Sequence, residues 1–264
     1  MGLMKDNHVY SYSQLSSVSE CPYMFYLERI EQPKVETVSN GFAERGTLIH
    51  DLIDQWAKGE LTKQQLPMEY DRRYADEVVT QFPAVLLSKG YAKKAYQMGI
   101  DYFINFDEFA GYTILGTEEK FQIDLPLSDG TTRPFVGIID MVLKDDLTDE
   151  LIICDHKSKS KASFRKAEDE MYRQQLLYTP YVKNKYGQYP DRLMFNLFNE
   201  LGMKPERPFD MTQYQNALQW ATEMVNRIEN YSMLEWLETK NQDFFCENIC
   251  SVRHVCPNGV PQRR

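Results

Sequence analysis

The sequence predicts one α/β domain with additional helices, and three observations carry this prediction. Apolar residues recur at helical spacing through about residue 108. The pattern then changes to alternating or continuous apolar runs, separated by turn sequences, up to residue 157. A helix, a strand and a final long helix follow, and no internal repeat or linker divides the 264 residues.

The composition is that of an ordinary globular protein and limits the possible functions. Apolar residues make up 42% and charged residues 26% of the chain. No apolar run has the length of a membrane span, and the N-terminus lacks the apolar core of a signal peptide, so we expect a cytoplasmic protein without a membrane partner. The net charge of −9 argues against a protein that coats nucleic acid, but metal-binding carboxylates in an enzyme would add such charge.

The first part of the chain is expected to be helical. Residues 10–30 predict a short helix capped by Ser13, followed by a second helix that Pro22 opens. Residues 42–58 predict an amphipathic helix with its apolar side chains on one stripe. More helix is expected through about residue 108, with a break near Pro83.

The middle of the chain is expected to form strands. Residues 121–125 alternate between apolar and polar, and Ser128-Asp-Gly130 predicts a turn. Residues 135–143 and 151–157 read as two buried strands joined by the polar turn Asp-Asp-Leu-Thr-Asp-Glu. The later elements expected are a helix from about residue 164 to Gly187, a strand over residues 192–199 and a helix capped by Thr212 that runs to about Asn230.

Two of these strands bring charged groups together. In Leu-Ile-Ile-Cys-Asp-His-Lys, the strand period of two places Asp155 and Lys157 on one face. If the two strands form a hairpin, a turn centred between Leu147 and Thr148 sets Asp140 opposite Asp155. A buried salt bridge that has only a structural role would also explain why these charged residues lie together. Converging carboxylates are also the ligands that Mg²⁺ or Mn²⁺ requires, and a nearby lysine could then orient the attacking water.

Further motifs accompany Asp140, Asp155 and Lys157 in the sequence. Gly-Ile-Ile-Asp140 followed by the Asp155-His-Lys157 strand resembles the core of PD-(D/E)XK nucleases, specifically the RecB-like and CRISPR-adaptation-nuclease branch. Gly46-Thr-Leu-Ile-His50 resembles the helix of that branch whose histidine binds metal, and Gln174-Gln-Leu-Leu-Tyr178 resembles its Q-x-x-x-Y helix motif. Glu118, at the start of a strand, is assigned a structural role only.

The resemblance implies a fold and roles for individual residues. The fold is a three-layer α/β core with a mixed central sheet, an N-terminal helical lobe and a C-terminal cluster segment. The expected metal ligands are His50, Asp140, Asp155 and the backbone carbonyl of His156, and the expected catalytic residues are Asp140, Asp155, Lys157, Gln174 and Tyr178. Residues 1–264 are expected to form a single nuclease domain: helical lobe about 40–110, core about 111–200, C-terminal helix and cluster segment about 211–257.

The cysteines indicate a second metal centre. Cys246, Cys250 and Cys256 lie close together, and Cys21 lies far away in the sequence. Thiolates at this density suit zinc or an iron–sulfur cluster, and their spacing does not choose between the two. Buried thiols without metal are the plainer alternative. Cys154, on the opposite strand face from Asp155, is expected to be a small core residue.

The resemblance favours the iron–sulfur cluster. Residues 16–27 and 250–257 are similar to the two halves of the cluster segment in the iron–sulfur branch, where one cysteine precedes the core and three follow it. This implies a [4Fe–4S] cluster held by Cys21, Cys246, Cys250 and Cys256, with zinc as the alternative. Here three residues separate Cys246 from Cys250, whereas the branch usually has two.

The function implied is a divalent-metal-dependent DNA nuclease. We expect an exonuclease on single-stranded DNA or DNA ends, acting in recombination, repair or phage DNA processing. The chain contains no helicase motif, so any unwinding would come from a partner. Two other hypotheses remain: a non-cutting, nuclease-derived DNA-binding or scaffold subunit of a helicase or recombination complex, and a zinc-stabilised protein unrelated to nucleic acid.

Overall fold

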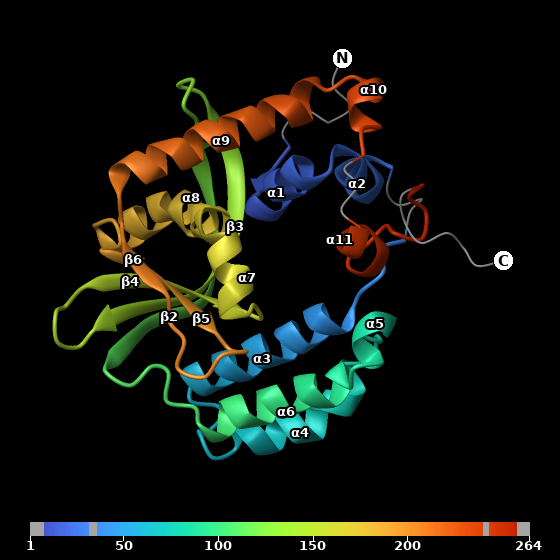
Figure 1. Ribbon diagram of the computed structural model, residues 1–264. Coiled ribbons are helices and arrows are strands. Elements are labelled where there is room, and N and C mark those ends of the chain that lie inside the picture. The colour runs from blue at the N-terminus through green and yellow to red at the C-terminus, as the bar shows by residue number, and fades with distance from the viewer. Residues whose placement is uncertain (1–7, 32–35, 240–242, 258–264) are drawn as a thin grey trace. The chain divides into compact units, whose positions relative to one another are not determined.

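The computed structural model describes residues 8–31, 36–239 and 243–257 (Figure 1). Its centre is a mixed six-stranded sheet in which β1, β3, β4, β5 and β6 are successive neighbours and β2 pairs with β3. Helices precede and follow the strands along the chain. The predicted α/β class with a mixed sheet is therefore confirmed.

The strands differ in length and direction. β3 pairs with β1 in parallel and with β4 in antiparallel orientation, β4 pairs with β5 in parallel orientation, and β5 pairs with β6 in antiparallel orientation. The bounds are β1 Tyr10–Ser11, β2 Tyr112–Pro126, β3 Thr132–Asp145, β4 Leu151–Lys157, β5 Arg192–Leu197 and β6 Glu206–Pro208.

The β3–β4 hairpin has the predicted register. Met141 lies opposite Cys154 and Lys144 opposite Leu151, so the same register places Asp140 opposite Asp155. The turn falls in the expected polar segment, where the Asp145 carboxylate accepts hydrogen bonds from the backbone N–H groups of Leu147 and Thr148. A short aspartate side chain that satisfies turn N–H groups is a common reason for a turn at such a sequence.

The chain divides into two compact units. The first comprises residues 1–39, 122–137 and 212–264, and the second comprises residues 40–121 and 138–211. Both long strands, β2 and β3, contribute residues to each unit. The prediction of a single nuclease domain stays a prediction.

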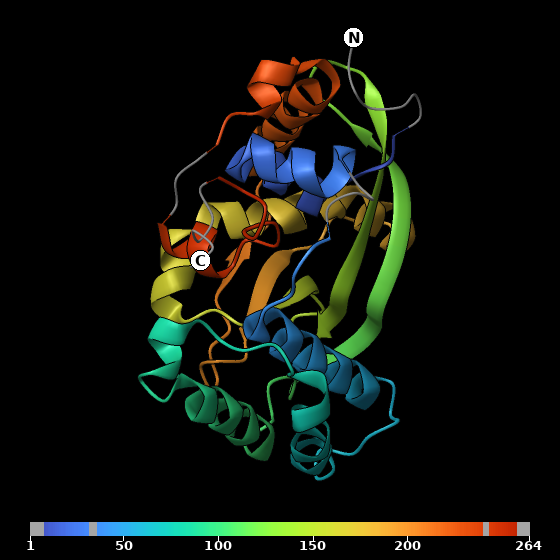
Figure 2. The ribbon, with the colours of Figure 1, turned by 90° about the vertical axis from the view of Figure 1, so that its right-hand side faces the viewer.

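The second unit has helices on both faces of its strands. α3 (Gly41–Ala57), α4 (Leu66–Glu77) and α6 (Tyr91–Ile104) lie side by side (Figures 1 and 2) and share one apolar core with Met141, Cys154 and Met194 of the sheet. On the other face, Phe164 of α7 (Lys161–Lys166) and Tyr172 of α8 (Glu168–Tyr186) pack on Phe195 with ring centroids 5.0 and 4.9 Å apart. Cys154 is a fully buried core residue, as predicted.

Several helix boundaries follow from local sequence. The helical structure is interrupted between α4 and α5 (Ala84–Leu87), and Pro83 directly precedes α5. α8 ends at Gly187, which adopts a φ of 82°, a conformation that suits glycine. The predicted helix from about residue 164 is in fact two helices, α7 and α8, joined at Ala167.

The first unit contains the remaining helices. They are α1 Tyr12–Glu20, α2 Pro22–Phe25, the π-helix η1 Tyr26–Ile30, α9 Met211–Asn230, α10 Met233–Trp236 and α11 Asp243–Asn248. Two predicted caps were wrong. Ser11, not Ser13, caps α1 by accepting the N–H of Gln14, because Ser13 already lies within the helix. α9 begins at Met211, so Thr212 is a helical residue.

Within the described ranges, no helix is both long enough and apolar enough to cross a membrane.

Candidate active site

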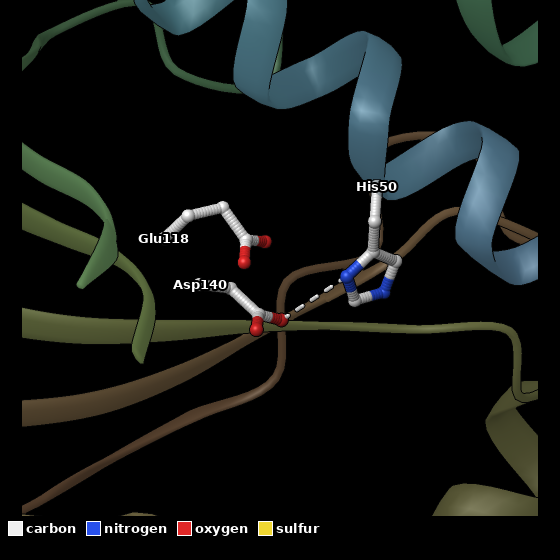
Figure 3. A group of neighbouring side chains, drawn as sticks. All are labelled: His50, Glu118 and Asp140. Atoms are coloured by element: carbon white, nitrogen blue, oxygen red, sulfur yellow. Dashed lines mark ion pairs between the residues drawn. The ribbon is translucent and has the colours of Figure 1, made fainter. Parts of the chain in front are cut away.

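Helix α3 and strands β2 and β3 bring a histidine and two carboxylates together. Donor atoms of His50, Glu118 and Asp140 lie within 4.8 Å of one another (Figure 3), and no other such set of three occurs among the residues that the structure describes. His50 comes from α3, Glu118 from β2 and Asp140 from β3. Carboxylate oxygens with one imidazole nitrogen are a donor set that Mg²⁺ or Mn²⁺ accepts.

Hydrogen bonds to the backbone of β4 orient two members of this group. His50 Nε2 donates to the carbonyl oxygen of His156 at 2.9 Å. Because a carbonyl can only accept, Nε2 carries the hydrogen in this contact. Nδ1 lies 3.6 Å from Asp140 Oδ2, which in turn accepts the backbone N–H of His156 at 2.8 Å. The backbone of β4 therefore orients both the imidazole and the Asp140 carboxylate.

Glu118 belongs to this group through an unusual backbone conformation. It has a φ of 47°, which residues other than glycine rarely adopt. Burial and the nearby Asp140 carboxylate raise the pKa of Glu118 above its ordinary value. Crowded carboxylates of this kind are stabilised when a cation binds between them. The sequence assigns Glu118 a structural role only, whereas the structure places its carboxylate in the candidate metal site.

The neighbouring Glu119 fixes β2 to α8. Its carboxylate accepts hydrogen bonds from the hydroxyls of Tyr181 and Tyr186, at 3.1 and 2.6 Å, and is bonded to the ammonium of Lys185. The two consecutive glutamates thus have different surroundings, Glu118 at the metal-ligand group and Glu119 on the helix. The Glu-Glu pair in a strand was the one signal in the sequence that an acidic ligand could lie here.

A second group of side chains lies on the α8 face of the sheet. Lys157 Nζ lies 2.7 Å from Asp155 Oδ2 and donates to Gln174 Oε1 at 3.4 Å. Gln174 Nε2 donates to the hydroxyl of Tyr178 at 3.2 Å. The four residues predicted from the motifs therefore form one continuous chain of polar contacts. Asp155 lies outside the His50–Glu118–Asp140 group, so its role as a metal ligand stays a prediction.

Burial and neighbouring charges shift the pKa values in and around this second group. Burial lowers the pKa of Lys157, but the carboxylates of Asp155 and Asp140 outweigh this effect, so the pKa is raised overall. Burial raises the pKa of Asp155, although the adjacent ammonium acts in the opposite direction. Burial also lowers the pKa of the His156 imidazole to about 3, so that side chain is neutral at physiological pH. Its Nδ1 lies 3.2 Å from the amide nitrogen of Asn196.

One cleft is lined by members of both groups. The cleft has a volume of about 750 Å³ and is lined by His50, Glu118 and Lys157, by residues along α3 from Phe42 to Lys58, and by Lys120 and Phe198. Three basic side chains, Lys161, Arg165 and Lys166, are exposed on α7, which follows β4 in the chain. An ammonium group beside a candidate metal site in an open cleft is an arrangement that can hydrolyse a phosphodiester.

Four of the five cysteines line a separate pocket in the first unit. Cys21, Cys246, Cys250 and Cys256 surround it, with Met24 and Val252 among its apolar walls. All five cysteines are among the described residues, and none forms a disulfide. Cys250 and Val252 pack with Met24 and Leu27 in a small core, so the C-terminal cysteine segment contacts the N-terminal helices of its unit.

The comparisons with known proteins agree with this chemistry. A family model described as "PD-(D/E)XK nuclease superfamily" matches residues 9–257. A solved structure titled "Crystal structure of SSO0001" is 13% identical, with 74% of this chain and 82% of that chain covered at a TM-score of 0.31, and so distant a likeness carries no argument. No curated protein matches the chain.

Proposed function

The chain belongs to the PD-(D/E)XK nuclease superfamily, whose members are metal-dependent nucleases, and we propose that it hydrolyses single-stranded DNA or DNA ends as an exonuclease. The observation that carries the proposal is the cleft that His50, Glu118 and Lys157 line together. Asp140 lies beside the first two, and Asp155 is paired with Lys157. A structural ion pair alone would not need the histidine or Glu118.

The residues present suit a divalent cation. His50 and the carboxylates of Glu118 and Asp140 would hold Mg²⁺ or Mn²⁺, and Asp155 and the backbone carbonyl of His156 remain predicted donors. When bound, the cation would polarise the scissile phosphate and lower the pKa of a water molecule.

Lys157 is placed to donate hydrogen bonds. Despite burial of the side chain, the carboxylates of Asp155 and Asp140 raise its pKa, which favours the ammonium form. It can donate hydrogen bonds to the attacking water and to the oxygens on which charge develops. Asp155 holds the ammonium at 2.7 Å, and Gln174, supported by Tyr178, accepts from it on the α8 side. These contacts orient Lys157 toward the cleft.

The test uses end-labelled single- and double-stranded DNA with Mg²⁺ or Mn²⁺, under anaerobic conditions. Asp140→Ala and Lys157→Ala should each reduce cleavage by at least about 100-fold, with an unchanged circular dichroism spectrum. Asp149→Ala and Lys144→Ala are matched controls, because this ion pair lies on the same hairpin but is exposed. Full activity in either site variant contradicts the mechanism, and DNA binding without cleavage in the wild type supports a non-cutting subunit instead.

The cysteine pocket suits a [4Fe–4S] cluster in the same proposal. Four thiols supply the four soft ligands that such a cluster needs. Cys246 lies on α11 and Cys250 lies two residues beyond the end of that helix, and both line the pocket despite the three-residue spacing between them.

Metal analysis of an anaerobic preparation distinguishes the cluster from zinc. We expect iron and acid-labile sulfide in equal amounts, which Cys21→Ser should remove. Cys154→Ala should retain them, because Cys154 lies in the core of the other unit. A colourless protein that contains zinc and no sulfide contradicts the cluster.

The proposal also includes action together with a helicase or recombination partner. Co-purification of such a partner with the protein on DNA tests this part.

A further inference from the structure

The cleft continues along α3 beyond the metal-ligand group. Phe42, Gly46, His50 and Asp54 all line it and are spaced four residues apart, so they share one face of the helix. Phe42 lies eight residues before His50, which is about 12 Å along a helix. The candidate metal site accounts for His50 and leaves the stretch from Phe42 to Gly46 unexplained.

Gly46 is a glycine that the fold does not require. A Cβ atom at this position would meet no atom within 4 Å. At Gly99 and Gly41, by contrast, a Cβ would come within 2.1 and 2.7 Å of other atoms, so packing explains those two glycines. Glycine inside a helix is unfavourable because it loses more backbone freedom than alanine. Gly46 therefore keeps open space in the cleft at a cost to the helix.

Phe42 offers an aromatic surface at the same end of the cleft. The side chain is only half-buried and lines the cleft. Its ring is supported from behind by Phe82 and Tyr91, with centroids 5.1 and 5.6 Å away. An aromatic ring that is fixed by neighbours and faces a phosphodiesterase centre is suited to stack on a nucleobase.

The charges of the cleft fit a nucleic-acid strand. Lys157 and the exposed Lys120 line it near the metal-ligand group. Of the other charged residues, Asp51 is paired with Arg73, and Asp54 with Lys58. Base faces are covered by their neighbours within a duplex, so only an unpaired base can lie on Phe42.

We propose that Phe42 and Gly46 form a subsite for an unpaired nucleotide adjacent to the scissile phosphodiester, with the base on Phe42 and the sugar and phosphate over Gly46. The subsite rests on the proposed nuclease function and commits the enzyme to single-stranded substrate at this end of the cleft.

Substitution of Gly46 separates binding from folding. Gly46→Ala and Gly46→Leu should melt at or above the wild-type temperature, because the fold has room for a side chain and the helix favours one. Gly46→Leu should nevertheless bind a single-stranded oligonucleotide about tenfold more weakly in Ca²⁺, where no cleavage occurs. A stable Gly46→Leu variant with wild-type affinity overturns the subsite.

Substitution of Phe42 tests the stacked base. Phe42→Leu should lose about tenfold in affinity, and Phe42→Tyr should retain wild-type affinity because it keeps the ring. An oligonucleotide with a single abasic position, moved along the strand, should weaken wild-type binding at one position and should have no further effect on Phe42→Leu. Equal effects of the abasic position on both proteins overturn the assignment of Phe42.

A short substrate keeps this inference distinct from the proposed function. The 4-nitrophenyl ester of thymidine 5′-monophosphate reaches the metal-ligand group but has no neighbouring nucleotide, so its hydrolysis by the wild type tests the nuclease function without the subsite. Failure of the wild type to hydrolyse either the ester or DNA contradicts the nuclease function. Hydrolysis of both, with unchanged DNA cleavage in Phe42→Leu and Gly46→Leu, overturns the subsite alone.

Discussion

A single hydrogen bond orients His50 at the residue scale. Its Nε2 donates to the carbonyl of His156, and its Nδ1 lies 3.6 Å from Asp140 Oδ2 in the candidate metal site. The backbone of β4 thus positions a side chain that belongs to a helix far away in the sequence.

Glu118 provides the sharpest test of the metal site. Glu118→Gln removes one negative charge and should weaken Mn²⁺ binding by about tenfold, or ~1.4 kcal/mol, as measured by calorimetric titration. Asp51→Asn is the matched control, because Asp51 lines the same cleft but bonds to Gln55 and Arg73. Equal Mn²⁺ affinities of Glu118→Gln and the wild type would show that Glu118 is not a ligand.

Some site residues could be predicted from the sequence because strand geometry is regular. The period of two placed Asp155 and Lys157 on one face, and the hairpin register set Asp140 opposite Asp155. Glu118 could not be found in this way. Its position depends on a φ of 47°, which no strand pattern encodes.

At the scale of elements, a partly exposed ion pair joins α9 to the strands of its unit. Glu229 accepts two hydrogen bonds from the guanidinium of Arg133, at 2.7 and 3.0 Å, and one from the hydroxyl of Tyr10 at 3.0 Å. The two charged side chains are about one-third exposed, at 29% and 31%. The hydrogen bond from Arg133 lowers the pKa of Glu229 below its ordinary value.

The lowered pKa predicts how stability depends on pH. The contribution of Glu229 is present above its unfolded-state pKa, about 4.5, and is lost as the pH falls through the lower folded-state pKa. Glu229→Gln should therefore lower the free energy of unfolding by about 1 kcal/mol at pH 7, and by less at pH 3.5. Urea titrations at both values test this, with the exposed Glu223→Gln on the same helix as a control. A pH-independent difference contradicts it.

The elements themselves were predictable to different degrees. β4 has the predicted bounds, because an unbroken apolar run between a turn and a polar segment leaves little choice. The caps of α1 and α9 were displaced by one or two residues, since several serines, threonines and aspartates compete for the same role. The separation of α7 from α8 at Ala167 has no signal in the hydrophobic pattern.

At the scale of the whole molecule, the two candidate metal centres lie in different compact units. The metal-ligand group belongs to residues 40–121 and 138–211, and the four thiols belong to the other unit. The sequence could not predict this division, because β2 and β3 are continuous strands that contribute to both units.

The division predicts independent loading of the two centres. Cys21→Ser should lose its iron, yet bind Mn²⁺ within about twofold of the wild-type affinity, a difference of ~0.4 kcal/mol. Calorimetric titration on the same preparation that is used for iron analysis measures both properties. If Mn²⁺ binding is lost together with the iron, the two centres are coupled and the prediction is wrong.

The cysteine unit is assembled from three separate segments of the chain, and this has a consequence during translation. Cys21 leaves the ribosome 235 residues before Cys256, a delay of about 10 to 50 s at ordinary elongation rates. All of the candidate ligands of the divalent cation emerge within that interval. A cluster on these thiols would therefore be completed only after Cys256 has emerged, so a nascent chain that stalls between Lys157 and Cys256 would have its candidate metal-ligand group before its cluster.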